Sequence, residues 1–443
     1  MGPLRSVVDG LLGMFYVRNV TASFRPPLEP IPNYIEQSLP YFMVLVVLEA
    51  LVLRVRGGGW RITDATGSVT QGLAQEVLRY TLRGCEGWAY VYVWRHWRCF
   101  DVPWDSPASF WLTMLGVDFG YYWFHRASHE VNLVWASHQV HHSSEFYNLS
   151  TALRQSMVQQ YLSWGVYLPL ALLGVAPSMF FTHAQFNLVY QFWIHTELVK
   201  SVGPLEHVLN TPSHHRVHHG SNVKYLDKNY AGVLIVWDRL FGTFCWEEET
   251  PTYGLVHNIE SYDMWTIQLA HFRWIASDVR EQVGWKNKLK RLLYGPGWVP
   301  GTGRLGDAST FPDPDPKRAR FDTAMPGWLQ VYTAVHFIVT LVPAVNFAQN
   351  HLLYPVLTSL LYSVQLLYGL TCLGWLLDGA RLAPLAELLR CCLCLVSLSY
   401  IAWLPAFALT VARAIFTVSL LVCISLGWGD ITTSVKMVKA KME

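Results

Sequence analysis

Apolar residues of this chain are concentrated in a few long stretches, and the longest are long enough to cross a lipid bilayer. A span needs about 20 residues without charge, because the hydrocarbon core is about 30 Å thick. Residues 323–377 contain no Asp, Glu, Lys or Arg, and the polar stretch 347–351 divides them into two expected spans. Residues 391–429 contain only Arg413 among charged residues and add one or two more. The pattern predicts an all-α, polytopic helical membrane protein.

Two earlier segments give weaker signals. Residues 42–53 are apolar apart from Glu49, and extension back through Tyr41 predicts one span near residues 40–55. Residues 155–182 contain no charged side chain and predict either a span or a hairpin broken by prolines. A more polar region, with most of the histidines, separates these segments from the C-terminal spans.

Between the histidines and the last spans, the pattern changes twice. Residues 265–294 mix tryptophans with lysines and arginines, as a helix in the membrane–water interface would, and an ordinary surface helix explains the same pattern. Residues 295–326 are rich in Gly and Pro and predict an irregular linker. Its GTGRLG sequence matches a dinucleotide-binding pattern, but such a loop follows a buried strand and opens a helix. Because Pro-rich sequence flanks this one, we expect no nucleotide site.

Composition agrees with a membrane protein. Of the 443 residues, 52% are apolar and 14% are charged, whereas soluble domains carry about 25% charged residues. The net charge of +2 provides no electrostatic footprint for a nucleic acid, which we exclude as a partner. Five of the eight cysteines lie in apolar stretches and the other three lack CxxC spacing. We therefore expect neither a disulfide scaffold nor a zinc ribbon.

Histidines carry the strongest chemical signal. Seventeen histidines spread evenly over 443 residues would place about four within residues 125–219, but twelve lie there. Eight of them form one HxxxH and two HxxHH clusters: His125, His129, His138, His141, His142, His215, His218 and His219. On a helix, positions i, i+3 and i+4 share one face, so each cluster presents its imidazoles in one direction. Metal binding is the natural use of such clusters.

Eight imidazoles exceed what one metal ion accepts, so the clusters predict two ions. Imidazole suits Zn, Cu, Fe or Ni, and ligand type alone does not choose among them. His195 is a ninth candidate ligand, with a hydrogen-bonded core histidine as the alternative. Asp118 lies seven residues before His125, on the same helical face, where its carboxylate would accept the second ring proton unless it is simply solvated. The histidines expected to be structural are His183, His207 and His214.

The three clusters resemble the signature of the fatty acid hydroxylase/sterol desaturase superfamily, whose membrane-bound non-haem di-iron enzymes carry histidine boxes on cytosolic helical segments. The stretches DFGYYWFHRASHEVNLVWASHQVHH, NTPSHHRVHHG and DKNYAGVLIVWDRLFGTF are similar to its tetrahydrobiopterin-dependent ether lipid monooxygenases. The resemblance covers residues 105–260 most closely and implies that the eight box histidines bind iron, with His195 a further ligand. It also implies that Glu130, directly after HxxxH, serves pterin use; a solvated or ion-paired acid is the alternative.

The reaction implied by the resemblance is hydroxylation, with molecular oxygen, of the ether-linked carbon of a 1-O-alkylglycerol or lyso-ether phospholipid. The resulting hemiacetal breaks down to a fatty aldehyde and a glycerol product. Implied cofactors are two iron ions and tetrahydrobiopterin; an external reductant is required because the sequence has no haem motif, credible Rossmann loop or ferredoxin cysteines. The alternatives are a sterol or fatty acid hydroxylase or desaturase with a protein electron donor and, more remotely, a histidine-rich metal transporter.

The expected organisation has five parts, in which the histidine site is cytosolic. They are an N-terminal membrane-anchoring region (1–104), a catalytic domain (105–260), interfacial helices with a linker (261–326), C-terminal transmembrane helices (327–432) and a basic tail (433–443). Lys439 and Lys441 resemble a dilysine retrieval signal, so we expect a multi-pass protein of the endoplasmic reticulum membrane. The oligomeric state stays open.

Overall fold

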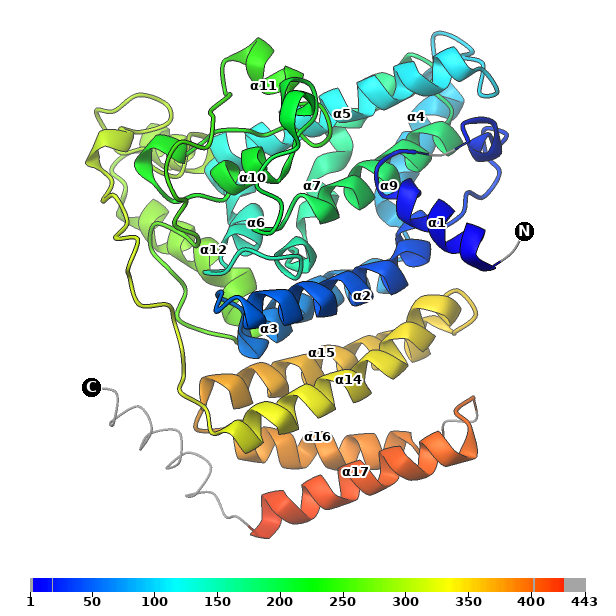
Figure 1. Ribbon diagram of the computed structural model, residues 1–443, viewed down its shortest axis with the longest axis vertical. Helices are drawn as coiled ribbons and strands as arrows, with labels where there is room; N and C mark the ends of the chain where they lie inside the picture. Colours follow the sequence, from blue (N-terminus) through cyan, green and yellow to red (C-terminus); the bar gives the residue numbers. More distant parts are fainter. Residues whose placement is uncertain (1–2, 18, 401–402, 426–443) are drawn as a thin grey trace. The chain divides into compact units, whose positions relative to one another are not determined.

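The computed structural model describes residues 3–17, 19–400 and 403–425. Every named element in these ranges is helical, apart from two isolated β-bridges, Leu209–Leu234 and Gly220–Tyr253. The expected all-α class is confirmed (Figure 1). The lysines of the expected retrieval signal, and the whole basic tail, lie outside the described residues.

The chain divides into two compact units. The first contains the described parts of Met1–Trp60, Gly84–Asn258 and Ala270–Arg318. Its helices are α1 (Pro3–Gly13), α2 (Tyr34–Val55), α4 (Trp88–Trp97), α5 (Pro107–Glu130), α6 (Asn132–His142), α7 (Gln159–Ser163), α8 (Leu168–Leu172), α9 (Pro177–Trp193), α10 (Pro212–His218), α11 (Val236–Phe241), most of α12 (Met264–Glu281) and α13 (Trp285–Leu293). The second unit contains α3 (Ile62–Thr81), the start of α12, α14 (Gly327–Asn350), α15 (Val356–Asp378), α16 (Ala383–Ser397) and α17 (Ala406–Ser425).

Short 3₁₀ turns connect several of these helices. They are Thr21–Ser23, Cys85–Gly87, Thr151–Leu153, Trp164–Tyr167, Gly203–His207, Val223–Tyr225 and Ala308–Thr310. Tight turns of this kind let the chain reverse direction between helices without long loops.

Four described helices are long and apolar enough to span a membrane: α2, α14, α15 and α17. The expected span near residues 40–55 is present in α2, which begins earlier, where the Asn33 side chain accepts a hydrogen bond from the Glu36 backbone N–H (3.1 Å). The two spans expected within residues 323–377 are α14 and α15. The chain is therefore a polytopic membrane protein.

Residues 155–182 are broken at their prolines rather than forming one long helix. Pro169 lies in the first turn of α8 and Pro177 begins α9. Proline fits there because the first helical N–H groups need no intrahelical acceptor. None of the resulting helices is among the candidate spans, so of the two expected alternatives the single long span is wrong.

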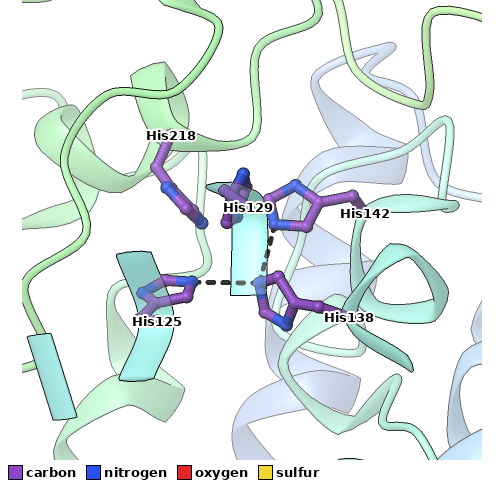
Figure 2. Close-up of side chains that lie close together, drawn as sticks. All are labelled: His125, His129, His138, His142 and His218. Atoms are coloured by element: carbon purple, nitrogen blue, oxygen red, sulfur yellow. Dashed lines mark hydrogen bonds between the residues drawn. The ribbon is translucent and has the colours of Figure 1, made fainter. Parts of the chain in front are cut away.

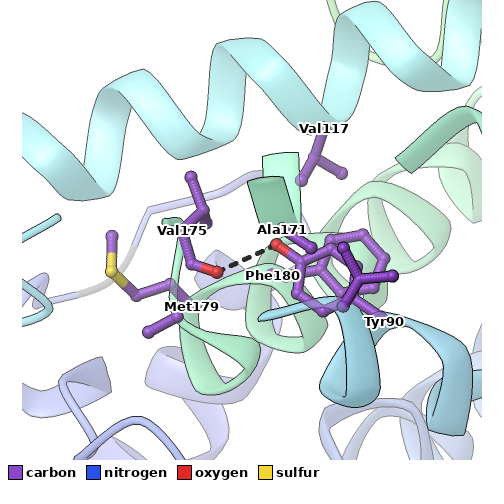
Figure 3. Close-up of a cluster of buried hydrophobic side chains, with 8 residues drawn as sticks. Tyr90, Val117, Ala171, Val175, Met179 and Phe180 are labelled. Atoms are coloured by element: carbon purple, nitrogen blue, oxygen red, sulfur yellow. Dashed lines mark hydrogen bonds between the residues drawn. The ribbon is translucent and has the colours of Figure 1, made fainter. Parts of the chain in front are cut away.

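The first unit holds α5 in place with an aromatic and aliphatic core (Figure 3). The ring of Tyr90, on α4, stacks on Phe180 of α9 at 4.0 Å, and its hydroxyl donates to the Val175 carbonyl (3.0 Å). Val117 of α5 and Ala171 of α8 complete the contact between the four helices. Each large side chain buried here contributes about 1.5–3 kcal/mol, which anchors the helix that carries the HxxxH cluster.

The second unit packs its helices around two apolar clusters and one buried polar group. Helix α3 contacts both α14 and α15, and α16 pairs with α17. Within the bundle, Arg390 forms an ion pair with Glu387 (2.5 Å) and contacts Nδ1 of His336 (2.8 Å). Charged groups inside a membrane bundle pair with one another because lipid does not solvate them.

Candidate metal centre

The nine candidate ligands converge in the first unit and divide into two groups, in each of which the ligand nitrogens all lie within 4.8 Å of one another. The first group, shown in Figure 2, is His125, His129, His138, His142 and His218. The second group is His141, His195, His215 and His219. All nine imidazoles are buried. Four segments contribute them: the last two turns of α5, helix α6, the end of α9 and helix α10 with the residue after it.

The break between α5 and α6 turns the first two clusters toward each other. Val131 is extended (φ −125°, ψ 112°) and separates the two helices. The N–H of Asn132, which starts α6, donates to the Tyr294 carbonyl (2.8 Å), so the new helix begins with one of its free donors satisfied. The chain therefore folds back at this point, and imidazoles from both helices meet.

Each HxxHH cluster is shared between the groups. His138 and His142, one turn apart on α6, belong to the first group, whereas His141 belongs to the second. In the other cluster, His215 and His219 belong to the second group and His218 to the first. On a helix, position i+4 is rotated by about 40° from position i in one sense and position i+3 by about 60° in the other. The i+3 histidine of each cluster therefore reaches across to the neighbouring group.

Oxygen acceptors determine which ring nitrogen points into the second group. The Nδ1–H of His141 donates to the Arg154 carbonyl (3.0 Å), and that of His195 donates to the Gln191 carbonyl (2.7 Å). Carbonyl oxygens only accept, so in the neutral rings the Nε2 atoms carry lone pairs. These two Nε2 atoms lie 3.1 Å apart. Two lone pairs that face each other repel unless a cation lies between them, which is the arrangement of a metal site.

The first group has the same construction. The Nδ1–H of His125 donates to the Tyr230 carbonyl (2.7 Å), and that of His138 donates to Oε1 of Gln159 (3.1 Å). Their Nε2 atoms lie 3.0 Å apart. His218 donates from Nδ1 to the Lys228 carbonyl (2.9 Å), and its buried Nε2 has no partner in the described structure. Such outer hydrogen bonds fix the tautomer and orientation of metal-binding imidazoles.

Burial keeps these imidazoles neutral. It lowers the pKa of His141 to about 4, with the nearby Arg154 charge adding to the shift. Burial, together with neighbouring imidazoles, also lowers the pKa of His125 and His218 well below the usual value. A neutral imidazole is the form that binds a metal ion, so both groups fit metal ions at neutral pH.

Asp118 is buried but does not contact His125. Its carboxylate accepts hydrogen bonds from the Val233 and Leu234 backbone N–H groups, Nε1 of Trp237 and Nδ2 of Asn187, at 2.8–2.9 Å. The expected hydrogen bond between Asp118 and the His125 ring is therefore not formed, because the Tyr230 carbonyl takes that position. Asp118 instead holds the segment just after Tyr230.

Glu130 lies beside the first group without belonging to it. Its two carboxylate oxygens accept hydrogen bonds from Nε of Arg126 (2.7 Å) and from a guanidinium nitrogen of Arg304 (2.8 Å). Arg304 comes from the GTGRLG segment, in which the sequence predicts no nucleotide site. Through Arg304, this segment contacts the carboxylate and the backbone carbonyl of Glu130.

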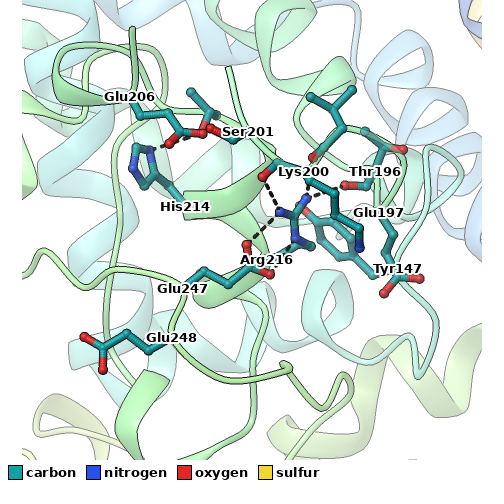
Figure 4. A network of polar contacts seen from close by, with 12 residues as sticks. Tyr147, Thr196, Glu197, Lys200, Ser201, Glu206, His214, Arg216, Glu247 and Glu248 are labelled. Atoms are coloured by element: carbon teal, nitrogen blue, oxygen red, sulfur yellow. Dashed lines mark hydrogen bonds and ion pairs between the residues drawn. The ribbon is translucent and has the colours of Figure 1, made fainter. Parts of the chain in front are cut away.

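Arg216, within the third cluster, was missed by sequence reasoning. Figure 4 shows its guanidinium between Glu247 and the chain that follows His195. It is 2% exposed, pairs with both Glu247 oxygens (2.8 and 2.6 Å), and donates to the carbonyls of Thr196, Val199 and Lys200. The sequence signal that could have identified Arg216 is its position as a charged residue between the candidate ligands His215 and His218. Arg216 ties α10 to the segment that carries His195.

Glu49 supports the second group from the candidate span α2. It is 3% exposed and accepts hydrogen bonds from the Leu149 N–H (2.6 Å) and the Thr196 hydroxyl. Thr196 directly follows His195 in the chain. A lone acid in an apolar span was the sequence signal for such a role.

Glu49→Ala is expected to lower the metal content of the purified protein, because Thr196, which Glu49 holds, directly follows His195. The effect should be smaller than the about 10–100-fold loss of metal affinity that follows removal of a direct hydrogen-bond partner of a ligand. Glu49→Gln retains an acceptor oxygen and should lose less. Leu48→Ala, at a position 51% exposed on the same helix, is the control. Elemental analysis of the three purified variants makes the test, and wild-type metal content in Glu49→Ala would contradict the role.

The three histidines expected to be structural lie in neither group. His183 is fully buried with its ring against Phe110 (4.2 Å between ring centres), and Nδ1 of His214 lies 3.4 Å from the Thr211 hydroxyl. His207 is exposed beside Trp246. These surroundings suit packing and surface positions.

The site and the helices define a class of protein, and comparisons with known proteins agree. Residues 110–243 match the fatty acid hydroxylase family, and residues 329–414 match the alkylglycerol monooxygenase C-terminal domain. The chain is therefore a membrane oxygenase whose buried histidine groups fit a metal centre.

Relatives along nearly the whole chain specify the family. Alkylglycerol monooxygenase of Xenopus tropicalis is 44% identical over 89% of both chains, and that of Homo sapiens is 44% identical over 87% of both chains. An ornithine lipid hydroxylase of Rhizobium tropici is 28% identical over 34% of this chain. No solved structure matches significantly. The chain belongs to the alkylglycerol monooxygenase family, and the resemblance inferred from its histidine clusters is confirmed.

Proposed function

We propose that this protein is a tetrahydrobiopterin-dependent monooxygenase that hydroxylates the ether-linked carbon of 1-O-alkylglycerols and lyso-ether phospholipids. The main support is the convergence of Nε2 lone pairs in two adjacent buried groups, within a chain that is similar to alkylglycerol monooxygenases along most of its length. Neutral imidazoles suit iron among other metals, and the oxygenase family makes iron the choice.

In this proposal the two histidine groups hold one iron ion each. Bound iron supplies the redox chemistry with molecular oxygen that a carbon of modest reactivity requires. The chain itself supplies nine neutral ligands and excludes water, since all nine imidazoles are buried. The Tyr230, Arg154 and Gln191 carbonyls hold the ligand rings in the tautomer that points Nε2 inward.

The overall reaction replaces one hydrogen on the ether-linked carbon by a hydroxyl group. A tetrahydropterin held beside Glu130 would supply the two electrons and two protons with which the second oxygen atom of O₂ becomes water, and would itself be oxidised to a dihydropterin. The hemiacetal product then breaks its carbon–oxygen bond to the glycerol side, which leaves a fatty aldehyde and a glycerol product. No cofactor is needed for that last step, because hemiacetals decompose spontaneously.

Glu130 is the proposed pterin contact. Its carboxylate already receives two planar guanidinium groups, and the aminopyrimidine edge of a pterin presents a similar pair of parallel N–H donors. Arg304, whose side chain is 47% exposed, is the partner that a pterin would displace from Glu130. These contacts of Glu130 support a pterin site beside the first histidine group in this proposal.

Glu130→Ala is expected to raise the Michaelis constant for tetrahydrobiopterin about tenfold or more, because a lost hydrogen bond to a charged group costs about 1.5–3 kcal/mol. The iron content should change much less, since Glu130 is in neither histidine group. Titration of activity with pterin and elemental analysis measure the two quantities. Glu248→Ala, at an exposed acid paired with Lys224, is the control. Equal losses of pterin affinity and iron would make Glu130 a structural residue.

The function itself is tested with membranes that contain the protein, a 1-O-alkylglycerol and oxygen, with and without tetrahydrobiopterin. Mass spectrometry follows the fatty aldehyde and its acid. Pterin-dependent aldehyde is the expected result. If a folded, iron-loaded sample gives no product, the substrate assignment is wrong. The next hypothesis is then oxidation of sterols or acyl chains with a separate reductase.

The proposed location is the endoplasmic reticulum membrane, with the metal centre on the cytosolic side. Lys439 and Lys441 support it from the sequence. In this organisation, residues 105–260 form the catalytic domain and residues 327–432 the C-terminal membrane helices. Lipid substrates would then reach the site from the bilayer that holds the spans.

A further inference from the structure

Helix α13 carries three of its four apolar side chains on its exposed face. Trp285, Leu289 and Leu293 are 70%, 45% and 48% exposed. They are spaced four residues apart and so form one row along the helix. Val283, just before the helix, is 85% exposed. Exposing a contiguous row of large apolar side chains to water is unfavourable, and such a row indicates a surface that binds a protein or a membrane.

The most buried side chain of α13 is a charged one, and the apolar Leu292 on the same side is only partly buried, which differs from an ordinary surface helix. Arg291 is 5% exposed, forms an ion pair with Asp278 of α12 and donates to the Trp298 carbonyl. An amphipathic helix on a soluble protein turns its apolar stripe to the core. In α13 the apolar row instead faces away from the protein.

Positive charges line the apolar row. Lys286 and Lys290 are exposed and lie one turn apart beside it. The Lys286 ammonium lies 5.9 Å from the centre of the Trp285 ring, and that of Lys290 lies 5.6 Å from the Tyr294 ring. An apolar row with tryptophan, bordered by lysines, matches the headgroup region of a bilayer with anionic lipids.

We propose that α13 docks on the surface of a lipid bilayer that contains anionic headgroups. The Trp285–Leu289–Leu293 row enters the boundary between headgroups and acyl chains, and the two lysines contact lipid phosphate and carboxylate groups. This contact is additional to the candidate spans and does not depend on the proposed reaction.

The docking helix is bonded directly to the helix that carries the second histidine cluster. Asn132, at the start of α6, is fully buried. Its side-chain amide donates to the Arg291 carbonyl (2.8 Å), and its backbone N–H donates to the Tyr294 carbonyl (2.8 Å). The end of α13 therefore caps α6. Binding of α13 to lipid fixes the orientation of the histidine centre relative to the bilayer surface.

The test places a photoreactive benzophenone amino acid at Leu289 of the full-length protein. The protein is reconstituted in nanodiscs of phosphatidylcholine with phosphatidylserine, irradiated, and analysed for lipid adducts by mass spectrometry. The same amino acid at Glu248, 59% exposed and outside α13, is the control. We expect about tenfold more lipid adduct at Leu289, because its side chain enters the bilayer interface. Wild-type metal content shows that each variant is folded.

The charge component is tested by Lys286→Glu with Lys290→Glu. In the wild-type background, we expect phosphatidylserine to increase Leu289 adducts about tenfold over phosphatidylcholine alone. The double variant should lose this increase. Crosslinks from Leu289 to a second copy of the chain or to another protein, in place of lipid, would overturn the proposal. So would equal lipid labelling at Leu289 and Glu248.

Discussion

His218→Ala should abolish turnover and lower bound iron in the same preparation. His218 is one of five histidines in the first group, its Nε2 is buried, and the Lys228 carbonyl holds its Nδ1 (2.9 Å). Removal of outer partners of a metal ligand already costs about 10–100-fold in metal affinity or activity, so loss of the ligand itself should exceed the upper end of that range. His142→Ala, in the same group, should behave alike.

His207→Ala is the control variant for this prediction. His207 is exposed and lies in neither histidine group, so its loss should leave both activity and iron content near the wild-type values. Elemental analysis and product formation are measured on the same purified samples. Full activity in His218→Ala, or normal iron content in an inactive variant, would count against ligation by this residue.

Asp118→Ala should give the largest loss of stability of any substitution considered. Asp118 is 1% exposed, and its carboxylate accepts four hydrogen bonds from two backbone N–H groups, Trp237 and Asn187. Each buried donor left without an acceptor costs about 1–3 kcal/mol, so the variant should lose several kcal/mol. The segment after Tyr230 would then loosen, and with it the carbonyl that orients His125.

Thermal unfolding of the purified protein measures this effect. Asp118→Asn keeps the shape and one acceptor oxygen, so it should lie between Ala and wild type. Asp101→Ala is the control, since Asp101 forms an exposed ion pair with Arg98. If Asp118→Asn were inactive while its stability and iron content stayed normal, Asp118 would act in the reaction itself, and a positioning role would be wrong.

Some features of the fold could be predicted from the sequence because they depend on one segment at a time. A long apolar stretch without charge suits lipid, and α14 and α15 form where the charge pattern predicts them. Absence of charge alone was not enough for residues 155–182, whose short helices are not candidate spans. α16, with 15 residues, is shorter than a span, although part of region 391–429, in which Arg413 is the only charged residue, lies in it. There the ends of the helices depend on the turns between them, which charge patterning does not describe.

The site shows the same division. Spacing along α6 and α10 determined which imidazoles share a helical face, and so that metal ligands would cluster. It did not determine that His141 joins His195 while His138 joins His125, because that assignment depends on how the helices cross.

Only the tertiary structure decided which groups hold these ligands. The Tyr230 carbonyl is 105 positions from His125, and Arg304 is 174 positions from Glu130. The carboxylate of Glu49 reaches Thr196 across a gap of 147 positions. Hydrogen bonds of this kind require donor and acceptor atoms of two distant segments to lie within about 3 Å, and no local pattern encodes that distance. Local sequence was enough to predict the spans α2, α14 and α15 and the residue types that bind metal, whereas packing of distant segments sets how the ligands are grouped, oriented and kept neutral.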